Sequence, residues 1–335
     1  MAQATPPSQH RPVMAPQVLE MLSHAFHDPQ IFDGIVVDGT VGGGGHAVQM
    51  AERLGSNGRL IGFDRDPRAV QASRDALTGS KEITIIQDSY AEIERCLEQE
   101  SVSAVLLDLG LCTDHILSDR GFSFSRESLL DMRFDPSSEL SAYDVVNHYS
   151  IARLREIFFK YGEEPLAPRI ARRIAEKRLG GSIKTTTELA QVIREAIPAR
   201  FEIKALARIF QAIRIEVNGE IEHLERGIEA CWRTLKVGGV LCVISYHSLE
   251  DRRVKRFFAA QAKGCICPPR FPICACGRKP SAKILTSSAL RPTPPEIRLN
   301  PASRSARLRA ARKLLTSREP LPWDGSDGSQ AAAKK

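Results

Sequence analysis

No stretch of this 335-residue sequence is apolar over the roughly 18 residues that a membrane-spanning helix requires. The first residues also lack the order of a secretory leader, in which a basic segment precedes a hydrophobic one. We therefore expect a cytoplasmic protein with no membrane partner. The chain is longer than one average domain of roughly 100–200 residues, which predicts a catalytic core with an insertion.

Arrangements typical of hydrolases are missing as well. We find neither a Ser-His-Asp order nor the paired carboxylates of a glycosidase, so hydrolysis is not indicated. Eight cysteines in a chain without a leader are expected to be reduced thiols. Four of them form two C-x-C pairs: Cys265, Cys267, Cys274 and Cys276.

These four thiols lie within twelve residues and can in principle hold one zinc ion. Zinc ribbons, however, usually place two residues between paired cysteines, and here there is one. We assign no metal ligand. A zinc site and a set of small, partly buried side chains remain the alternatives.

Positive charge is concentrated near the C-terminus. The net charge is +7, and between Arg291 and Glu319 eight basic residues face only two acidic ones. The basic residues are Arg291, Arg298, Arg304, Arg307, Arg309, Arg312, Lys313 and Arg318. We expect a tail that faces the phosphates of a nucleic acid; the alternative is a solvated helix surface.

Strands alternate with helices in the first third of the chain. Strands are expected at 34–38, 59–64, 83–87 and 104–108, and helices at 47–54 and 67–77. This alternation predicts an α/β fold with a doubly wound, mostly parallel sheet. It stops over 114–210, where helices are expected at 151–160, 167–179 and 187–196. It resumes with a helix at 218–235, a strand at 240–245 and a helix at 249–262.

The domain organisation follows from this interruption. We predict a core formed by 13–113 and 211–315, and an inserted helical domain, 114–210, that recognises the substrate. The ends, 1–12 and 316–335, are rich in proline, glutamine, glycine and serine and are expected to be disordered.

A glycine-rich loop follows the first strand in residues 38–46 (DGTVGGGGH). Glycines allow a ligand to approach the backbone closely, and a helix N-terminus offers free N–H groups. Asp64 ends the next strand, where a carboxylate can bind both ribose hydroxyls of an adenosine cofactor. Asp38 opposes the pyrophosphate of NAD but suits the ammonium group of S-adenosylmethionine. We therefore predict S-adenosylmethionine, bound in part by Asp38.

Asp108 ends the strand at 104–108, at the carboxyl edge where open α/β sheets bind ligands. An acceptor there can hold an exocyclic amino group with its lone pair directed at a methyl donor. We predict that Asp108 is catalytic; the alternative is a helix cap or a solvated acid. DNA amino-methyltransferases carry an Asp/Asn-Pro-Pro-aromatic motif at this place, and residues 108–111 (DLGL) lack it.

Six segments in order resemble one known family. They are 38–46 (DGTVGGGGH), 64–67 (DRDP), 120–124 (RGFSF), 130–135 (LDMRFD), 244–251 (ISYHSLED) and 300–305 (NPASRS). They are similar to the motifs of the MraW/RsmH family, and the match runs from about Arg11 to Leu315. The resemblance implies a Rossmann-like methyltransferase core interrupted by a helical domain. It also implies methylation of the exocyclic N4 of cytosine 1402 in 16S rRNA, within the small ribosomal subunit or its late assembly particle.

The resemblance also implies site residues. Cofactor contacts are expected at Gly44, Gly45, His46, Asp64, Tyr90, Asp108 and His115. Tyr90 stands where the family usually has Phe, which preserves an aromatic ring for stacking on adenine. His115 stands where the family usually has Gln, within 112–115 (CTDH) in place of Ser-Ser-x-Gln, so an ordinary loop histidine is the alternative.

Substrate contacts are expected at five positions: Asp131, Arg133, Ser245, His247 and Arg304. Residues 127–129 (ESL) depart from the more usual Asp-Gly-Pro and leave Asp131 and Arg133 in place. For Ser245 and His247 the alternative is a role at the start of the following helix, where Ser248 and Glu250 are suited to capping. Two other functions stay open, a DNA amino-methyltransferase and a non-catalytic RNA-binding assembly factor. The three retained acids favour an enzyme.

Overall fold

The structure is a computed structural model, and it describes residues 11–79, 82–111, 115, 118–263, 265, 267–268, 271–273, 275–315 and 323. The chain divides into two compact units. Unit 1 combines Met1–Gly110 with His223–Lys335, and unit 2 is Leu111–Glu222. The chain therefore leaves unit 1 once, forms unit 2 and returns.

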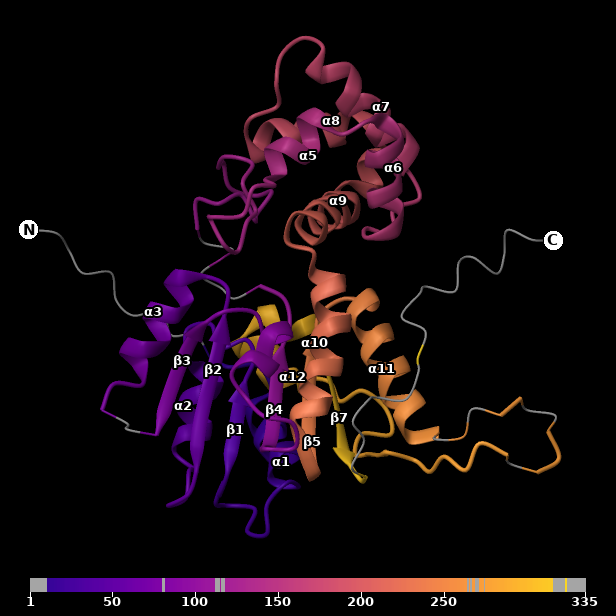
Figure 1. Ribbon diagram of the computed structural model, residues 1–335. Coiled ribbons are helices and arrows are strands. Elements are labelled where there is room, and N and C mark those ends of the chain that lie inside the picture. The colour runs from indigo at the N-terminus through magenta and orange to yellow at the C-terminus, as the bar shows by residue number, and fades with distance from the viewer. Residues whose placement is uncertain are drawn as a thin grey trace, which may run out of the picture. The chain divides into compact units, whose positions relative to one another are not determined.

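A seven-stranded sheet forms the centre of unit 1 (Figure 1). In sheet order its strands are β3 (Ile83–Gln87), β2 (Arg59–Asp64), β1 (Ile35–Asp38), β4 (Val102–Asp108), β5 (Leu235–Ser245), β7 (Arg307–Lys313) and β6 (Ala282–Ile284). The first five strands are parallel, and β7 is antiparallel to both β5 and β6.

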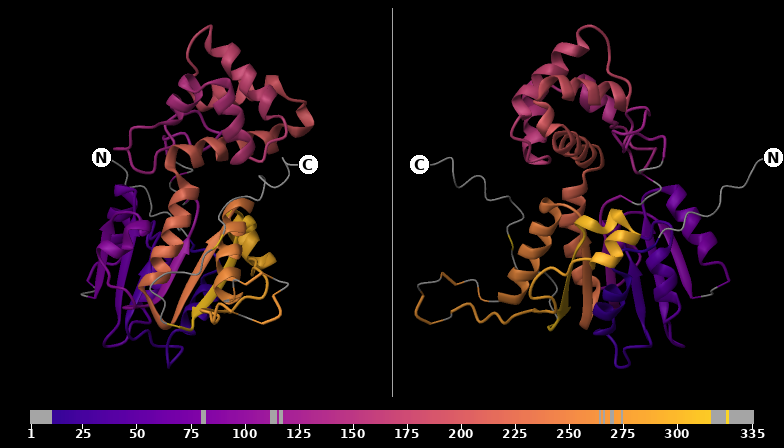
Figure 2. Two further views of the ribbon diagram at one scale, coloured as in Figure 1. Left: turned by 45° about the vertical axis from the view of Figure 1, so that its right-hand side comes forward. Right: turned by 180° about the vertical axis from the view of Figure 1, so that it is seen from behind.

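Helices cover both faces of this sheet (Figure 2). They are α1 (Ala15–Ser23), α2 (Gly45–Ala51), α3 (Pro67–Ala76), α11 (Ser248–Lys263), α12 (Pro294–Leu299) and most of α10 (Glu220–Thr234), with the 3-10 turns η1 (Tyr90–Arg95) and η3 (Pro301–Ser305). On β4, Ala104 and Leu106 face the core shared with α1 and α2, whereas Val105 and Leu107 face the core shared with α10 and α11. A parallel strand buried on both faces is apolar throughout. The predicted doubly wound α/β fold is confirmed, and it is Rossmann-like.

Unit 2 is helical around a core of its own. Its helices are α5 (Ala142–His148), α6 (Ile151–Lys160), α7 (Ala167–Arg178), α8 (Thr186–Ala196) and α9 (Glu202–Asn218), with the 3-10 turn η2 (Ala199–Phe201). Capping boxes start two of them, Ser141 with Asp144 at α5 and Thr185 with Glu188 at α8. Among the described residues of the whole chain, no helix combines the length and the apolar character needed to cross a bilayer.

The borders of unit 2 differ from those of the predicted insertion. Unit 2 extends beyond 114–210 at both ends. At its C-terminal end this is because the apolar face of α9, including Ile213 and Val217, packs into the unit 2 core. The expected single helix at 218–235 is also wrong at its start. Gly219 has a left-handed φ of 61°, which ends α9 at Asn218 and lets α10 begin at Glu220.

The basic segment near the C-terminus is not a tail. Residues 307–313 form β7, which lies between β5 and β6 in the sheet. Leu308 and Ala310 enter one core and Ala311 the other, so the segment is held by its small and apolar residues. The predicted disordered ends, 1–12 and 316–335, lie outside the described residues except for residues 11, 12 and 323.

Candidate active site

Three acidic side chains end neighbouring strands of the sheet. Asp38 ends β1, Asp64 ends β2 and Asp108 ends β4, and β1 pairs with both of the other strands in parallel. The negative charges of Asp64 and Asp108 both act to raise the pKa of Asp38. The predicted acids therefore meet at the carboxyl edge of the sheet, where open α/β proteins bind ligands.

Asp38 is the most buried of these acids, with 1% of its surface exposed. Its Oδ1 accepts a hydrogen bond from the backbone N–H of Thr40 at 3.2 Å. Its buried Oδ2 has no hydrogen-bond partner among the described residues. Desolvation raises the pKa of Asp38 to about 7, although nearby His46 acts to lower it. A cationic ligand would offset the cost of burying this carboxylate.

The glycine loop turns beside Asp64. Gly42 and Gly44 have φ values of 51° and 86°, a left-handed backbone that favours glycine. The backbone N–H of Gly42 donates to Asp64 Oδ2 at 2.9 Å, and that of Asp66 donates to Asp64 Oδ1 at 2.9 Å. Asp64 therefore holds both the glycine loop and the turn that leads into α3.

Asp108 lies in a small polar cluster. The Tyr246 hydroxyl donates to Asp108 Oδ1 at 2.9 Å, and His46 Nε2 lies 3.5 Å from Asp108 Oδ2. The backbone N–H of Asp108 donates to Thr40 Oγ1 at 2.7 Å. Desolvation, together with the charge of Asp108, raises the pKa of Tyr246 well above its usual value of 10. Tyr246 therefore remains a proton donor to Asp108 at neutral pH.

Sequence reasoning missed Tyr246. The available signal was its position inside the motif at 244–251, between two residues that were selected, Ser245 and His247. Tyrosine is commonly buried as an apolar ring, and its hydroxyl partner becomes apparent only once β4 and β5 pair side by side.

Tyr90 begins the 3-10 turn after β3 and is half-buried. Its ring lies against Gly227 of α10: a Cβ added at Gly227 would stand 2.1 Å from Tyr90 Cε2. A Cβ added at Gly39 would stand 3.0 Å from Tyr90 Cβ. Gly227 thus makes room for the Tyr90 ring, and Gly39, which follows β1, makes room for the Tyr90 Cβ.

His115 belongs to unit 2 and is buried in an aromatic cluster. Its ring centroid lies 5.3 Å from that of Phe122 and 5.0 Å from that of Phe134. The adjacent residues 112–114, which depart from the family pattern, lie outside the described residues. Packing between two phenylalanines gives His115 a structural contact that its sequence context did not predict.

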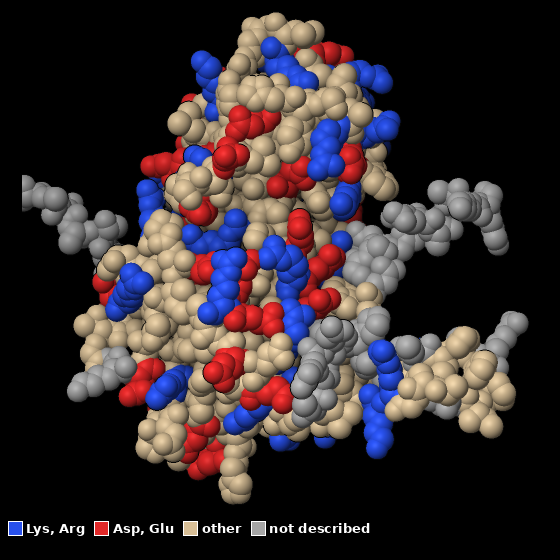
Figure 3. Space-filling view, in the orientation of Figure 1, with Lys and Arg blue, Asp and Glu red and all other residues tan. Residues whose placement is uncertain are grey.

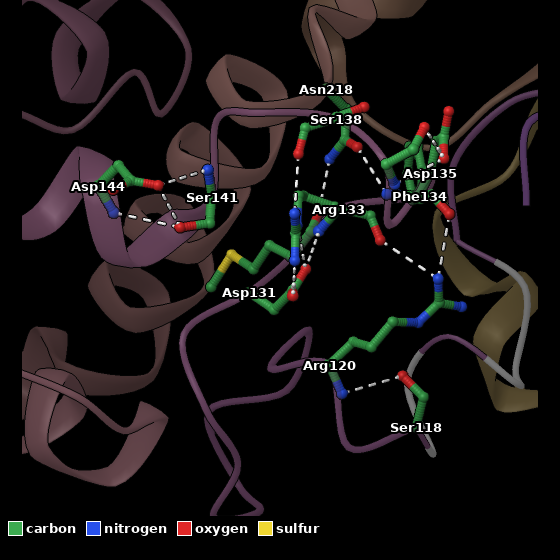
Figure 4. Close-up of polar contacts among 12 residues, drawn as sticks. Ser118, Arg120, Asp131, Arg133, Phe134, Asp135, Ser138, Ser141, Asp144 and Asn218 are labelled. Atoms are coloured by element: carbon green, nitrogen blue, oxygen red, sulfur yellow. Dashed lines mark hydrogen bonds and ion pairs between the residues drawn. The ribbon is translucent and has the colours of Figure 1, made fainter.

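Asp131 and Arg133, both predicted to contact substrate, bind each other (Figure 4). Arg133 donates from Nε to Asp131 Oδ1 at 3.0 Å and from Nη2 to Oδ2 at 2.7 Å, a two-pronged pair. Desolvation acts to raise the pKa of Asp131, but the hydrogen bonds and charge of Arg133 lower it overall. A third bond, from Arg133 Nη1 to the Ser138 carbonyl at 2.8 Å, shows that the pair holds the chain here.

The segment 118–141, called the unit 2 loop below, is fastened at two further points (Figure 4). Arg120 Nη1 donates to the Phe134 carbonyl at 3.0 Å. The buried Asn218 side chain accepts from the Phe134 N–H at 2.8 Å and donates to the Met132 carbonyl at 2.7 Å. Asn218 was not predicted, although a polar residue at the end of the apolar helix α9 was a signal for it.

His247 has a structural contact that sequence reasoning missed. Its Nε2 lies 3.1 Å from Glu250 Oε1, while Glu250 Oε2 accepts from the backbone N–H of Tyr246 at 2.8 Å. Glu250 therefore supports the start of α11, as expected. Ser245 is buried, and its hydroxyl donates to the Arg307 carbonyl at 3.4 Å, which ties β5 to β7.

The basic residues of 291–319 fall into two groups. Arg307 and Arg309 pair with Asp251 of α11 at 3.1 and 2.6 Å, and the fully buried Lys313 donates to the Leu235 carbonyl at 2.7 Å. Arg304 is exposed. The interior group corrects the expectation of one phosphate-facing tail, because these cations are already paired or bonded inside the sheet. Arg318 lies outside the described residues.

Charges of both signs mix on the face shown in Figure 3. Lys and Arg are interspersed with Asp and Glu within each unit on that face. The net charge of +7 therefore does not appear there as one uninterrupted basic field.

A doubly wound sheet with a glycine loop and an acid at the ends of β1, β2 and β4 is the arrangement of a nucleotide-type cofactor site. A family model described as the MraW methylase family matches residues 7–314. The chain belongs to this family. The resemblance expected from six short motifs is thereby confirmed over nearly the whole chain.

Relatives of this MraW methylase include proteins named Ribosomal RNA small subunit methyltransferase H. One from Syntrophotalea carbinolica is 43% identical over 314 residues, which are 91% of this chain and 98% of that protein. One from Desulfosudis oleivorans is 45% identical over 289 residues, 84% of this chain and 93% of that protein. Among solved structures, an rRNA methylase from Streptococcus thermophilus aligns with a TM-score of 0.37 and 13% identity, over 89% of this chain and 95% of that one.

The predicted cofactor is confirmed by this membership, since the family consists of S-adenosylmethionine-dependent methyltransferases. The residues present fit such a group. Asp38 offers a buried carboxylate oxygen that has no partner among the described residues, which is complementary to a cation. The left-handed Gly42 and Gly44 provide backbone without side chains in the loop that follows Asp38.

Proposed function

We propose that this MraW methylase transfers the methyl group of S-adenosylmethionine to the exocyclic N4 of cytosine 1402 in 16S rRNA. The relatives support the substrate class, because their name refers to RNA of the small ribosomal subunit. The observation that carries the chemistry is the cluster of buried Asp38 and His46 with half-buried Asp108 and Tyr246 at the carboxyl edge of the sheet. We place the enzyme in the cytoplasm, acting on the small subunit or its late assembly particle.

The cofactor, when bound, supplies an activated methyl group. We propose that it is held by Asp38, Gly44, Gly45, His46, Asp64, Tyr90, Asp108 and His115. Asp38 contributes a carboxylate for the ammonium group, which would satisfy the oxygen that lacks a partner among the described residues. Tyr90 contributes an aromatic ring that Gly227 makes room for.

Asp108 acts on the base. One carboxylate oxygen accepts an N–H of the cytosine amino group, which fixes the nitrogen with its lone pair exposed. The Tyr246 hydroxyl, which bonds Oδ1 at 2.9 Å, orients this carboxylate. No strong base is needed before methyl transfer, because the amino group becomes much more acidic once it carries the new methyl group.

The core and the helical insertion have different proposed roles. We propose that 13–113 with 211–315 is the catalytic core, and that the helical insertion, 114–210, recognises the RNA, from which the target base must be unstacked. Candidate substrate contacts are Asp131, Arg133, Ser245, His247 and Arg304. In this proposal the Asp131–Arg133 pair presents a preformed loop, whereas exposed Arg304 binds phosphate.

Methylation of isolated small-subunit particles by the purified enzyme tests this function. Digestion to nucleosides and mass spectrometry should find N4-methylcytosine, mapped to position 1402 by fragment analysis. A particle whose cytosine at that position is replaced by uridine is the matched control and should accept no methyl group. Methyl transfer to another base, to the cytosine ring carbon, or to DNA in preference to rRNA would contradict the proposal.

A further inference from the structure

Three cysteine thiols gather in the segment that follows α11. The Sγ atoms of Cys265, Cys267 and Cys276 all lie within 4.8 Å of one another. The Cys265 and Cys276 sulfurs are 3.7 Å apart, well beyond the roughly 2.05 Å of a disulfide bond. Thiols from the two ends of this segment, about ten residues apart in sequence, therefore lie in contact without a covalent bond between them.

Hydrogen bonds from Ser281 to Gln261 close the base of this segment. Beyond that base, its described residues form little structure that would hold the thiols together. None of the described residues between Lys263 and Ser281 is buried, and none lies in a helix or strand. Phe271 and Ile273 are 56% and 78% exposed, so the described residues of the segment form no apolar core. Figures 1 and 2 show the described part of the segment running out beyond the end of α11. Short segments without a core need a cross-link to keep one conformation.

We propose that Cys265, Cys267 and Cys276 bind a structural zinc ion. A tetrahedral zinc with Zn–S bonds of about 2.3 Å separates its sulfur ligands by about 3.8 Å. The Cys265–Cys276 sulfur distance of 3.7 Å matches this spacing. The atypical C-x-C spacing is thereby accommodated, because the third thiol comes from the far end of the segment. Cys274 lies outside the described residues, and the proposed site is built on the other three.

The chemical setting favours zinc. Thiolates are soft ligands that select zinc over magnesium or calcium, and a reducing compartment keeps them from forming disulfides. Lys263, Arg278 and Lys279 flank the cluster in sequence and are exposed, so their positive charges offset the negative charge of three thiolates around one divalent ion. The zinc closes the segment and holds its exposed tip, residues 271–273, in one place.

Metal content is the first test. The full-length chain, purified under reducing conditions without chelator, should carry about one zinc per molecule by plasma mass spectrometry. Cys265→Ser and Cys276→Ser should each retain less than about a tenth of that, because a three-thiolate site loses its zinc with any ligand. Cys96→Ser removes an exposed thiol outside the segment and should leave the zinc content unchanged. Wild-type protein that stays metal-free after incubation with zinc, or that holds iron instead, overturns the proposal.

Protease sensitivity supplies a readout that does not depend on activity. Trypsin can cut after Arg278, and we expect cleavage there to accelerate at least tenfold when zinc is chelated or when Cys276 is replaced by Ser. The rest of the chain should remain intact. Cleavage that is equally fast with and without zinc would contradict a structural ion. An intact mass two hydrogens below that of the reduced chain, unaffected by chelator, would show a disulfide instead.

Discussion

The carboxyl edge of the unit 1 sheet and the unit 2 loop both concentrate polar side chains, but they differ in how those groups are paired. At the sheet edge, Asp38 buries a carboxylate oxygen that has no partner among the described residues, and its pKa is raised to about 7. In the unit 2 loop, Arg133 donates hydrogen bonds to both carboxylate oxygens of Asp131, and the pKa of Asp131 is lowered.

The sheet edge therefore offers an unsatisfied carboxylate oxygen that a ligand can bind, whereas the unit 2 loop is stabilised by bonds within the chain. A buried polar group without a partner costs free energy that only a bound ligand can recover, so it marks a binding site. A group whose bonds are made inside the chain contributes to stability. Changes at the sheet edge should therefore alter binding and catalysis, and changes in the loop should alter folding.

The largest expected effect is on catalysis. Asp108→Ala should reduce single-turnover methylation at saturating cofactor by about 10²- to 10³-fold, because the acceptor that aligns the amino group is gone. The unfolding midpoint should move by only a few degrees. Tyr246→Phe, which removes just the hydroxyl that bonds Asp108, should cause a smaller loss. Near-normal turnover of Asp108→Ala would show that Asp108 takes no part in methyl transfer and contributes only to cofactor binding.

The next effect is on the stability of unit 2. Asn218→Ala removes hydrogen bonds to the Phe134 N–H and the Met132 carbonyl in a buried place, and should cost about 2–4 kcal/mol in urea unfolding. Cofactor affinity by titration calorimetry should change less than about threefold. Asn57→Ala, in an exposed turn of unit 1, is the control and should change neither the free energy of unfolding nor the cofactor affinity. If Asn218→Ala lost cofactor affinity but kept its stability, the unit 2 loop would serve binding and not folding, contrary to our expectation.

A third effect depends on pH, and its sign differs between the two regions. Asp38 has a folded-state pKa of about 7 against an ordinary value of 3.8, so the apo protein should lose stability as pH rises through this window. A cationic cofactor binds the ionised form, so its affinity should rise from about pH 5 to 7, by at most about tenfold per unit. Asp38→Asn should flatten both profiles.

Asp131 should show the opposite trend. Its pKa is lowered in the folded chain, so its contribution to stability is present at neutral pH and is lost as pH falls below its ordinary value of 3.8. Asp131→Asn should remove that contribution at pH 7 and leave the pH dependence of cofactor binding in place. If Asp38→Asn and wild type gave the same binding profile, Asp38 would not be the carboxylate that meets the cofactor.

The smallest effect concerns RNA. Arg304→Glu should weaken binding of small-subunit rRNA about three- to tenfold and lower the slope of log affinity against log salt by about one. Arg59→Glu carries the same charge change at an exposed place on β2 and serves as the control. Arg309→Glu should instead destabilise the fold, because Arg309 is paired with Asp251. Equal rRNA affinity for the Arg304 and Arg59 variants would show that Arg304 is a solvated surface residue.

Local sequence determined several elements well. The strands at 59–64 and 83–87 and the helix at 151–160 have the bounds that the structure gives them. The strand at 59–64 follows a glycine, the strand at 83–87 is rich in β-branched residues, and the helix at 151–160 is an amphipathic run that follows a serine cap. The acids at the strand ends could be placed at one edge for the same reason, since parallel strands align their carboxyl ends.

Tertiary structure decided the rest. Residues 307–313 look like a solvated basic run, and they form a strand only because β5 and β6 supply partners and Asp251 neutralises two arginines. The sequence located Asp38 and Asp131 alike as single acids of interest. Which of them stays without a partner among the described residues depends on backbone geometry: the turn at 131–133 lets Arg133 reach back to Asp131, whereas no described donor reaches Asp38 Oδ2.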